Sequence, residues 1–353
     1  MWPLYFSGTI AYYPGMNHAR IMAFGFFGGF VTGFLFTSLP RLLGAQCLKP
    51  WELLGVTALY CAVSVAHVCG ATSWGECLTF AWLVLLAGLM VPRFVNRTDL
   101  PPPGFVLVGL GGLCAAVGTG ISILESSYEF DSRWLVLRQL LEFQGFLLLP
   151  VTGVAGFILP RVIGLDERYV FAESPVPTRR WITHMLLACL VGAIVLNSFW
   201  YELEGSYRLA YSMRFLTVGA YVTWHVPWHR ALGKGTFPWS LRFGVASFIG
   251  GILLVAGFPE WRVPFVHLSF GIGLALISLV VASRVVFGHR ERLERMAGKQ
   301  AWFVWVVGLI FVGVTSRMIG DFIPKILISH YNYGALFWGL GVLLWARRLF
   351  WIK

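Results

Sequence analysis

The sequence predicts an all-α integral membrane protein with about eleven membrane-spanning helices. The chain of 353 residues is 58% hydrophobic and only 12% charged, whereas soluble domains carry about 25% charged residues. Apolar runs of about 20 residues, the length that crosses a bilayer, follow one another along the whole chain. No segment between these runs reaches about 50 residues, the lower size of a soluble domain. We therefore expect a single membrane domain over residues 1–353.

Proline, glycine and charged residues bound the apolar runs and set the limits of the predicted helices. In chain order the helices are expected at residues 18–40, 52–70, 76–93, 104–124, 135–160, 181–199, 208–224, 239–257, 264–287, 301–320 and 332–352. Many of the 16 Trp and 12 Tyr lie at the ends of these segments, as is typical of the two interfaces of a bilayer. Membrane lipid is therefore the expected surrounding of the chain.

The basic residues indicate an orientation. Most of the 27 Lys and Arg lie in alternate connections, starting with the one after the first predicted helix, and at the C-terminus. The positive-inside rule then predicts an N-terminus outside and a C-terminus in the cytoplasm. The net charge of +11 is spread over short loops and forms no single basic patch, so we expect no nucleic-acid partner.

Part of the sequence occurs twice. Gly25-Phe26, Val31-Thr32-Gly33, Leu39-Pro40-Arg41 and Gly44 recur as Gly145-Phe146, Val151-Thr152-Gly153, Leu159-Pro160-Arg161 and Gly164. In each copy we expect proline to end the helix, arginine to lie at the cytoplasmic interface and glycine to permit the turn.

A weaker copy of this helix end is Arg284-Val285-Val286-Phe287-Gly288, in the ninth predicted helix. The first, fifth and ninth helices therefore end in similar sequences, and we call them the marked helices. This spacing predicts three pseudo-repeated four-helix units, the first of which lacks its first helix. The predicted units are residues 1–100, 101–230 and 231–353.

Two histidines lie at the outer ends of marked helices. His18 opens the first helix and His267 the ninth, and each is followed by an aromatic residue and a glycine, Phe24-Gly25 and Phe270-Gly271. Two neutral imidazoles can be the axial ligands of a haem iron, and glycine lets a flat macrocycle approach a helix. The alternative is a pair of interfacial histidines bonded to nearby backbone.

Other histidines and cysteines have weaker patterns. His67, Cys69 and Cys77 could offer a soft copper site, although unrelated core and interface residues explain them as well. Cys69 and Cys77 flank one short loop and could form a disulfide in an oxidising compartment. His225 and His229 have metal-ligand spacing, but a proline lies between them, which favours a hydrated loop.

The motifs that contain these residues resemble those of the NnrS family. The segment His18-Ala19-Arg20-Ile21-Met22-Ala23-Phe24-Gly25-Phe26 is similar to the family motif H-A-H-E-M-x-F-G-F. His267 with Gly271 is similar to H-A-x-x-x-G, and Arg284-Val285, Gly288-His289 and Arg292 are similar to R-V-x-L-G-H-T-G-R. Two departures stand out, because Arg20 and Ile21 occupy the positions of the family's second His and its Glu.

The resemblance implies a bacterial inner-membrane protein of about twelve helices that contains haem and copper and is linked to the nitric oxide response. We expect His18, His267, Gly25, Gly271 and Arg20 to surround the haem. The resemblance assigns no role to Arg284, His289 and Arg292. A looser likeness to the haem-copper oxidase superfamily also places two haem-ligand histidines on the helices that carry His18 and His267.

Three hypotheses follow. The leading one is a b-type haem protein with a redox or nitric-oxide-stress role, whose partner is nitric oxide or a redox protein. The second is a transporter or permease, which internal repeats suit and for which Glu142 is the candidate buried carboxylate. The third is a haemless structural or assembly protein. Whether the protein turns over a substrate, and its oligomeric state, are left open by the sequence.

Overall fold

In the part of the chain that it describes, the computed structural model consists of helices joined by short connections. It describes residues 1–353 apart from 126, 165–170, 172–173, 227, 229–233 and 351–353. Within these residues nine helical segments are long and apolar enough to cross a membrane. They are Gly15–Leu42, Pro50–Val68, Thr72–Val95, Pro103–Glu125, Ser132–Val162, Arg179–Leu203, Thr236–Gly257, Pro259–His289 and Ala301–Phe322. The predicted fold class, all-α and multi-pass, is confirmed.

Two further predicted spans form helices that are less apolar. They are α11 (Tyr207–His225) and α16 (Leu327–Phe350). Arg208 and Arg214 lie within α11, and α16 has polar residues in its first two turns and two arginines in its last turn. Nine segments qualify as spans among the described residues, so the predicted number of eleven is not confirmed.

The distribution of side chains also differs from that of a soluble protein. Large apolar residues such as Leu54 and Leu343 are exposed, whereas Arg20, Glu76 and Glu142 are buried. In water, apolar surface tends to be removed from solvent and charged residues stay outside. Lipid reverses this preference, because ionisable residues in spanning helices face the protein interior.

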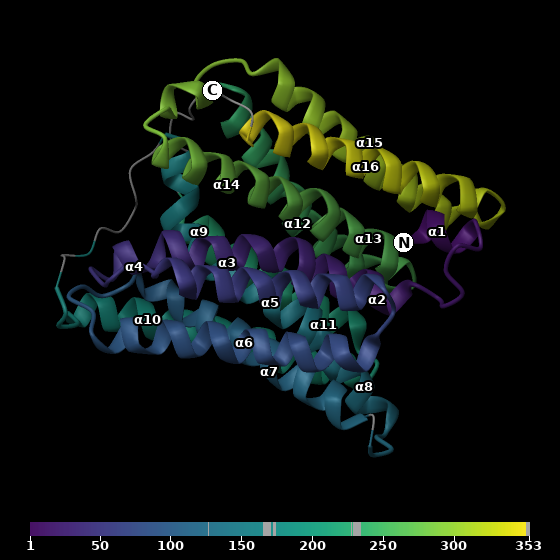
Figure 1. Cartoon of the computed structure of the whole chain (residues 1–353), viewed down its shortest axis with the longest axis horizontal. Coiled ribbons are helices and arrows are strands. Elements are labelled where there is room, and N and C mark those ends of the chain that lie inside the picture. Colours follow the sequence, from purple (N-terminus) through teal and green to yellow (C-terminus); the bar gives the residue numbers. More distant parts are fainter. Residues whose placement is uncertain (126, 165–170, 172–173, 227, 229–233, 351–353) are drawn as a thin grey trace. The chain divides into compact units, whose positions relative to one another are not determined.

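Two compact units divide the chain. The α2–α10 unit comprises Tyr12–Ala155 and Tyr169–Glu204. Its helices are α2 (Gly15–Arg20), α3 (Gly28–Thr37), α4 (Leu39–Leu42), α5 (Pro50–Val68), α6 (Thr72–Val95), α7 (Val106–Glu125), α8 (Ser132–Gln139), α9 (Phe146–Val162) as far as Ala155, and α10 (Arg179–Leu203). Within this unit α5 packs on α6, and α6 packs on α7 (Figure 1).

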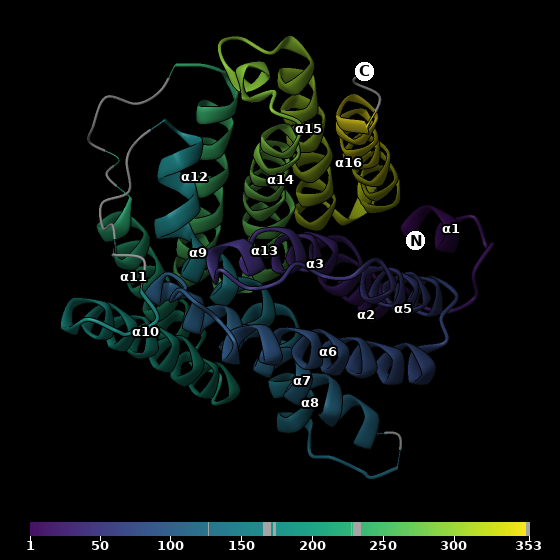
Figure 2. The same cartoon turned by 60° about the vertical axis from the view of Figure 1, so that its left-hand side comes forward.

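The α11–α16 unit comprises Met1–Ala11, Gly156–Arg168 and Gly205–Lys353. Besides α11 and α16 it contains α1 (Trp2–Phe6), α12 (Thr236–Gly257), α13 (Arg262–His267), α14 (Ala275–His289) and α15 (Ala301–Phe322). Figures 1 and 2 both show α15 and α16 side by side. The short α1 packs on α16, where the centres of the Trp2 and Tyr331 rings lie 5.2 Å apart.

Local sequence explains where several helices begin. α5 begins at Pro50, a residue that suits the first helical turn, and the Lys49 backbone N–H donates to Glu52 at 2.7 Å. Before α8, the Asp131 carboxylate accepts from the backbone N–H of Arg133 at 3.0 Å. This hydrogen bond to its charged form lowers the pKa of Asp131.

The two matched sequence copies end in the same backbone conformation. Gly44 and Gly164 both have a left-handed φ, of 58° and 73°, which glycine adopts without steric cost. The expectation that proline ends each helix is wrong, because α4 contains Pro40 and α9 continues past Pro160 to Val162. The glycine turn, four residues after the proline, follows the helix end in both copies.

Each of the three marked helices contains a π-helix. These are η1 (Ile21–Phe27), η3 (Leu140–Gly145) and η5 (Leu268–Leu274). π-Helices are rare and frequently occur at functional sites. Their recurrence in the first, fifth and ninth predicted helices agrees with the sequence pattern, although the division into three four-helix units stays a prediction.

The contact between α12 and η5 gives a stability prediction. A Cβ added at Gly273 on η5 would lie 2.5 Å from the backbone N and 2.6 Å from the Cα of Phe248 on α12. Because backbone cannot yield as a side chain does, Gly273→Ala should lower the free energy of unfolding in detergent by about 1–3 kcal/mol. Gly250→Ala on α12 is the control, since an added Cβ there meets nothing within 4 Å. Equal stability of the two variants would contradict this packing.

Candidate functional site

His267 is the last residue of α13 and lies directly before the π-helix η5. Its Nδ1 is 2.8 Å from the Val263 carbonyl oxygen. A carbonyl can only accept, so Nδ1 carries the proton and, in a neutral ring, the lone pair is on Nε2. This is the arrangement found in metal-binding histidines. The same contact forms at His225 and His289, at 2.9 and 2.7 Å, so it fixes the tautomer without being specific to a ligand.

A polar cluster from α15 and α16 lies within electrostatic reach of His267. Arg317 forms an ion pair with Asp321 at 2.5 Å, and both groups act on the imidazole. The Tyr331 hydroxyl donates to Asp321 at 2.5 Å, and the Arg317 guanidinium lies 3.4 Å from the centre of the Tyr331 ring. These contacts hold one positive and one negative charge in place near His267 in the α11–α16 unit.

The two glycines expected beside a macrocycle have packing contacts within their own units. A Cβ added at Gly271 would lie 2.9 Å from Val314 Cγ2, and the Gly271 carbonyl accepts from Trp338 Nε1 at 3.0 Å. The Gly25 carbonyl accepts a short hydrogen bond from the Tyr60 hydroxyl. Both glycines therefore lie in π-helices whose carbonyls bond to an aromatic side chain of a neighbouring helix. The sequence showed no signal for these hydrogen bonds.

His18 and Arg20 occupy different environments at the start of the first span. His18 is half-buried in α2, whereas Arg20 is 2% exposed. Arg20 forms a short ion pair with Glu76 on α6 and donates to the Ser122 hydroxyl at 2.9 Å. Arg20 is thus part of the interior of the α2–α10 unit. Its partner Glu76 could not be predicted from the sequence, because residues far apart along the chain give no pairing signal.

His18, Arg20 and His267 can be compared by their separation in sequence from the π-helix that follows them. Arg20 directly precedes η1, just as His267 directly precedes η5, and His18 lies two residues earlier. Counted from the π-helix, the counterpart of His267 is therefore Arg20. Counted from the Phe-Gly pairs, His18 also lies three residues earlier than His267, which is nearly one helical turn.

The model of the NnrS protein family matches residues 1–352. The chain belongs to the NnrS family. No protein of curated function and no solved structure matches it. Membership in the NnrS family confirms the resemblance carried by the motifs at His18, His267 and Arg284. It also makes Arg20 notable, since this position holds the second His of the family motif and here forms an ion pair with Glu76.

The third NnrS-like motif lies at the end of α14. Arg284 is half-buried, His289 is exposed and Arg292 follows the helix. Arg284 lies within electrostatic range of Arg161, which stacks 3.8 Å over the Phe157 ring. Two arginines from matched sequence copies thus lie near each other in the α11–α16 unit.

The residues predicted for copper are not brought together. His67 is fully buried, and its Nε2 lies 3.1 Å from the Thr79 hydroxyl, whereas Cys69 and Cys77 are exposed free thiols that form no disulfide. Among the described residues, no group of three His, Cys, Asp or Glu could hold a metal ion. Copper binding stays a prediction, and His229 lies outside the described residues.

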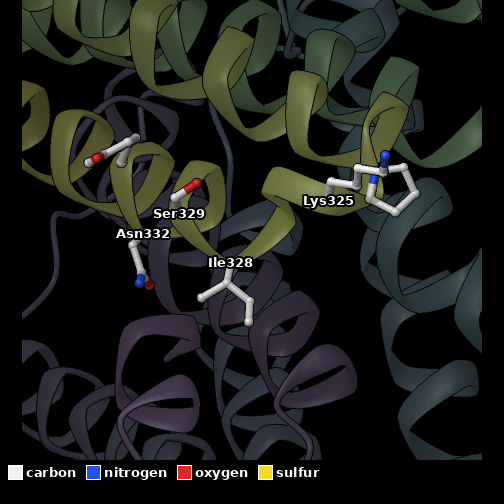
Figure 3. A pocket seen from close by; sticks show the side chains of 6 residues that line it. Lys325, Ile328, Ser329 and Asn332 are labelled. Carbon is white, nitrogen blue, oxygen red and sulfur yellow. The ribbon is translucent and has the colours of Figure 1, made fainter.

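A cavity of about 480 Å³ lies at the start of α16. Figure 3 shows Ser329 and Asn332 close together, with Lys325 set apart from them. The cavity is lined by Pro324, Lys325, Ile328, Ser329, Asn332 and Tyr333. They provide ammonium, hydroxyl and amide groups and no imidazole, so the cavity is distinct from the proposed haem ligands.

The Arg20–Glu76 ion pair gives a second prediction. Arg20→Met leaves the Glu76 carboxylate buried without its counter-ion, which should cost about 3–5 kcal/mol of stability. The double variant Arg20→Met/Glu76→Gln should recover most of this loss. Arg133→Met is the control, because its pair with Glu204 is exposed and should contribute less than about 1 kcal/mol. Denaturation in detergent measures all three, and an unchanged Arg20→Met variant would contradict the expectation.

Proposed function

We propose that this NnrS-family protein binds one b-type haem near the outer face of the bacterial inner membrane, with His18 and His267 as axial ligands. Its role would be in redox chemistry or nitric oxide stress. The observation that carries the proposal is the position of His267 directly before the π-helix η5, where its Nδ1 contacts the Val263 carbonyl at 2.8 Å. This contact directs the basic nitrogen of a neutral ring away from its own helix backbone, as a haem ligand requires.

The residues that are present fit the ligand set for haem. Imidazole is a common axial ligand, and the iron would supply one-electron redox chemistry. The Val263 carbonyl orients the ring of His267, and the nearby Arg317–Asp321 pair provides fixed charges that would influence the redox potential. Arg20, which is also expected beside the haem, forms an ion pair with Glu76, and its contact with haem stays a prediction.

A permease is the second candidate, and one observation favours it. Glu142 is a fully buried carboxyl residue in a spanning segment, and ionisable residues at such positions often mark ion or substrate pathways. Flux of a substrate into liposomes that contain the purified protein would distinguish a permease from a haem protein. A haemless structural protein would show neither flux nor haem absorption.

Haem ligation predicts a spectrum. Protein purified after expression with ample haem should show b-type bands in a reduced-minus-oxidised spectrum. The variants His18→Ala and His267→Ala should each lose or shift these bands, because each removes one axial ligand. His289→Ala is the control, since His289 is exposed at the end of α14 and makes the same backbone contact. An absence of bands in the wild type, or unchanged bands in both ligand variants, would refute the proposal.

The proposed topology, with the N-terminus outside and the C-terminus in the cytoplasm, can be tested with native cysteines. Cys47 precedes α5 and Cys69 follows it, and both thiols are exposed. In single-cysteine variants on intact spheroplasts, a membrane-impermeant maleimide should label Cys69 and spare Cys47. Permeabilisation should expose Cys47. The reverse pattern would show that the orientation is wrong.

A further inference from the structure

Ionisable side chains from five helical elements meet inside the α2–α10 unit. Two are arginines and three are glutamates: Arg20 on α2, Glu76 on α6, Glu125 on α7, Arg138 on α8 and Glu142 on η3. Each arginine has one carboxylate partner, since Arg20 pairs with Glu76 and Arg138 pairs with Glu125. Both guanidinium groups also donate to the Ser122 hydroxyl, at 2.9 and 3.3 Å. The third carboxyl, that of Glu142, forms no ion pair with an arginine among the residues that the structure describes.

Glu142 is the most deeply buried member of this cluster. The residue is 0% exposed, and neither carboxyl oxygen has a hydrogen-bond partner among the described residues. By contrast, Glu125 is 33% exposed at the end of α7. Glu142 lies four residues beyond Arg138, about 6 Å farther along the helix. The cluster therefore extends from a partly exposed carboxylate to a buried, unpaired one.

The packing of α7 against η3 provides the space for this carboxyl. A Cβ added at Gly118 on α7 would lie 2.8 Å from the Glu142 Cγ and 3.1 Å from the Arg138 carbonyl oxygen. The absence of a side chain at Gly118 therefore accommodates the stem of Glu142. The carboxyl occupies a place formed by the fold and is not simply a polar residue at a helix end.

The charge balance determines what Glu142 can bind. Glu76, Arg20, Arg138 and Glu125 are the charged groups that act on it, and they already form two neutral pairs. α10 also packs on η3 and carries the buried Glu202, which is a further acidic group. An ionised Glu142 would thus be an uncompensated charge in a spanning segment, which is strongly unfavourable.

A proton or a metal cation could neutralise this charge. A hard metal cation requires several oxygen ligands, and the positive charges of the two arginines beside Glu142 would repel it. A proton needs one carboxyl oxygen and brings no ligand requirement. We propose that Glu142 is a binding site for a single proton in the interior of the α2–α10 unit. The proton reaches it from the end of the cluster where Glu125 is partly exposed. The proton adds to one carboxylate oxygen to give the neutral acid, and on release it returns to the solution on that side.

Infrared spectroscopy tests this proposal directly. At neutral pH the wild type should show the carbonyl-stretch band of a protonated carboxylic acid in a dry environment, and the band should shift in D2O. Glu142→Gln should abolish it. Glu76→Gln and the exposed control Glu204→Gln should retain it, since Glu76 is paired with Arg20 and Glu204 with Arg133. A wild type without the band, a band unchanged in Glu142→Gln, or a band lost in Glu76→Gln would each overturn the assignment.

A second variant and a second measurement cover the case in which Glu142→Gln does not fold. Glu142→Asp keeps the carboxyl on a shorter stem and should keep a shifted band. In the wild type the folded state holds a proton that the unfolded state releases, so stability should fall as the pH rises. The Tm of the wild type should therefore decrease towards alkaline pH more than that of Glu142→Gln. Equal pH dependence would contradict the proposal. Because none of these readouts involves haem, failure of the haem proposal would leave them unaffected.

Discussion

The lack of water inside a bilayer is the constraint on which the rest of this structure depends. Each backbone N–H and C=O in a spanning segment needs a partner within the protein, and helices provide it. A π-helix alters this pattern locally, and here two glycine carbonyls in π-helices accept from side chains, Gly25 from Tyr60 and Gly271 from Trp338. The departures from α-helical geometry are thus tied to contacts between neighbouring helices.

The same constraint governs the charged residues. In an apolar surrounding a charge is stable only when it is paired and hydrogen-bonded, and Arg20 meets this condition through Glu76 and Ser122. This pair also explains how the spanning segment accommodates an arginine at position 20. Glu142, which lacks such a partner among the described residues, is where the charge balance requires a proton.

His267 and Glu142 belong to different units. His267 lies beside a neutral Arg317–Asp321 pair in the α11–α16 unit, an environment suited to a neutral ligand imidazole. Glu142 lies among the paired charges of the α2–α10 unit. Both occur at π-helices, His267 directly before η5 and Glu142 within η3. In each unit an ionisable residue therefore lies at a departure from regular α-helix.

The sequence by itself determined the membrane class, most helix positions and the family, because these depend on hydropathy, helix-breaking residues and local motifs. It also indicated Gly44 and Gly164, whose shared left-handed turn follows from local backbone sterics. It pointed to Glu142 as a carboxyl within a span. Only the tertiary structure decided that Arg20 pairs with Glu76 and that Gly118 makes room for Glu142. Such contacts join helices that are distant in the chain. The residues that form them resemble many other positions in hydropathy, so the sequence does not show which residues pair.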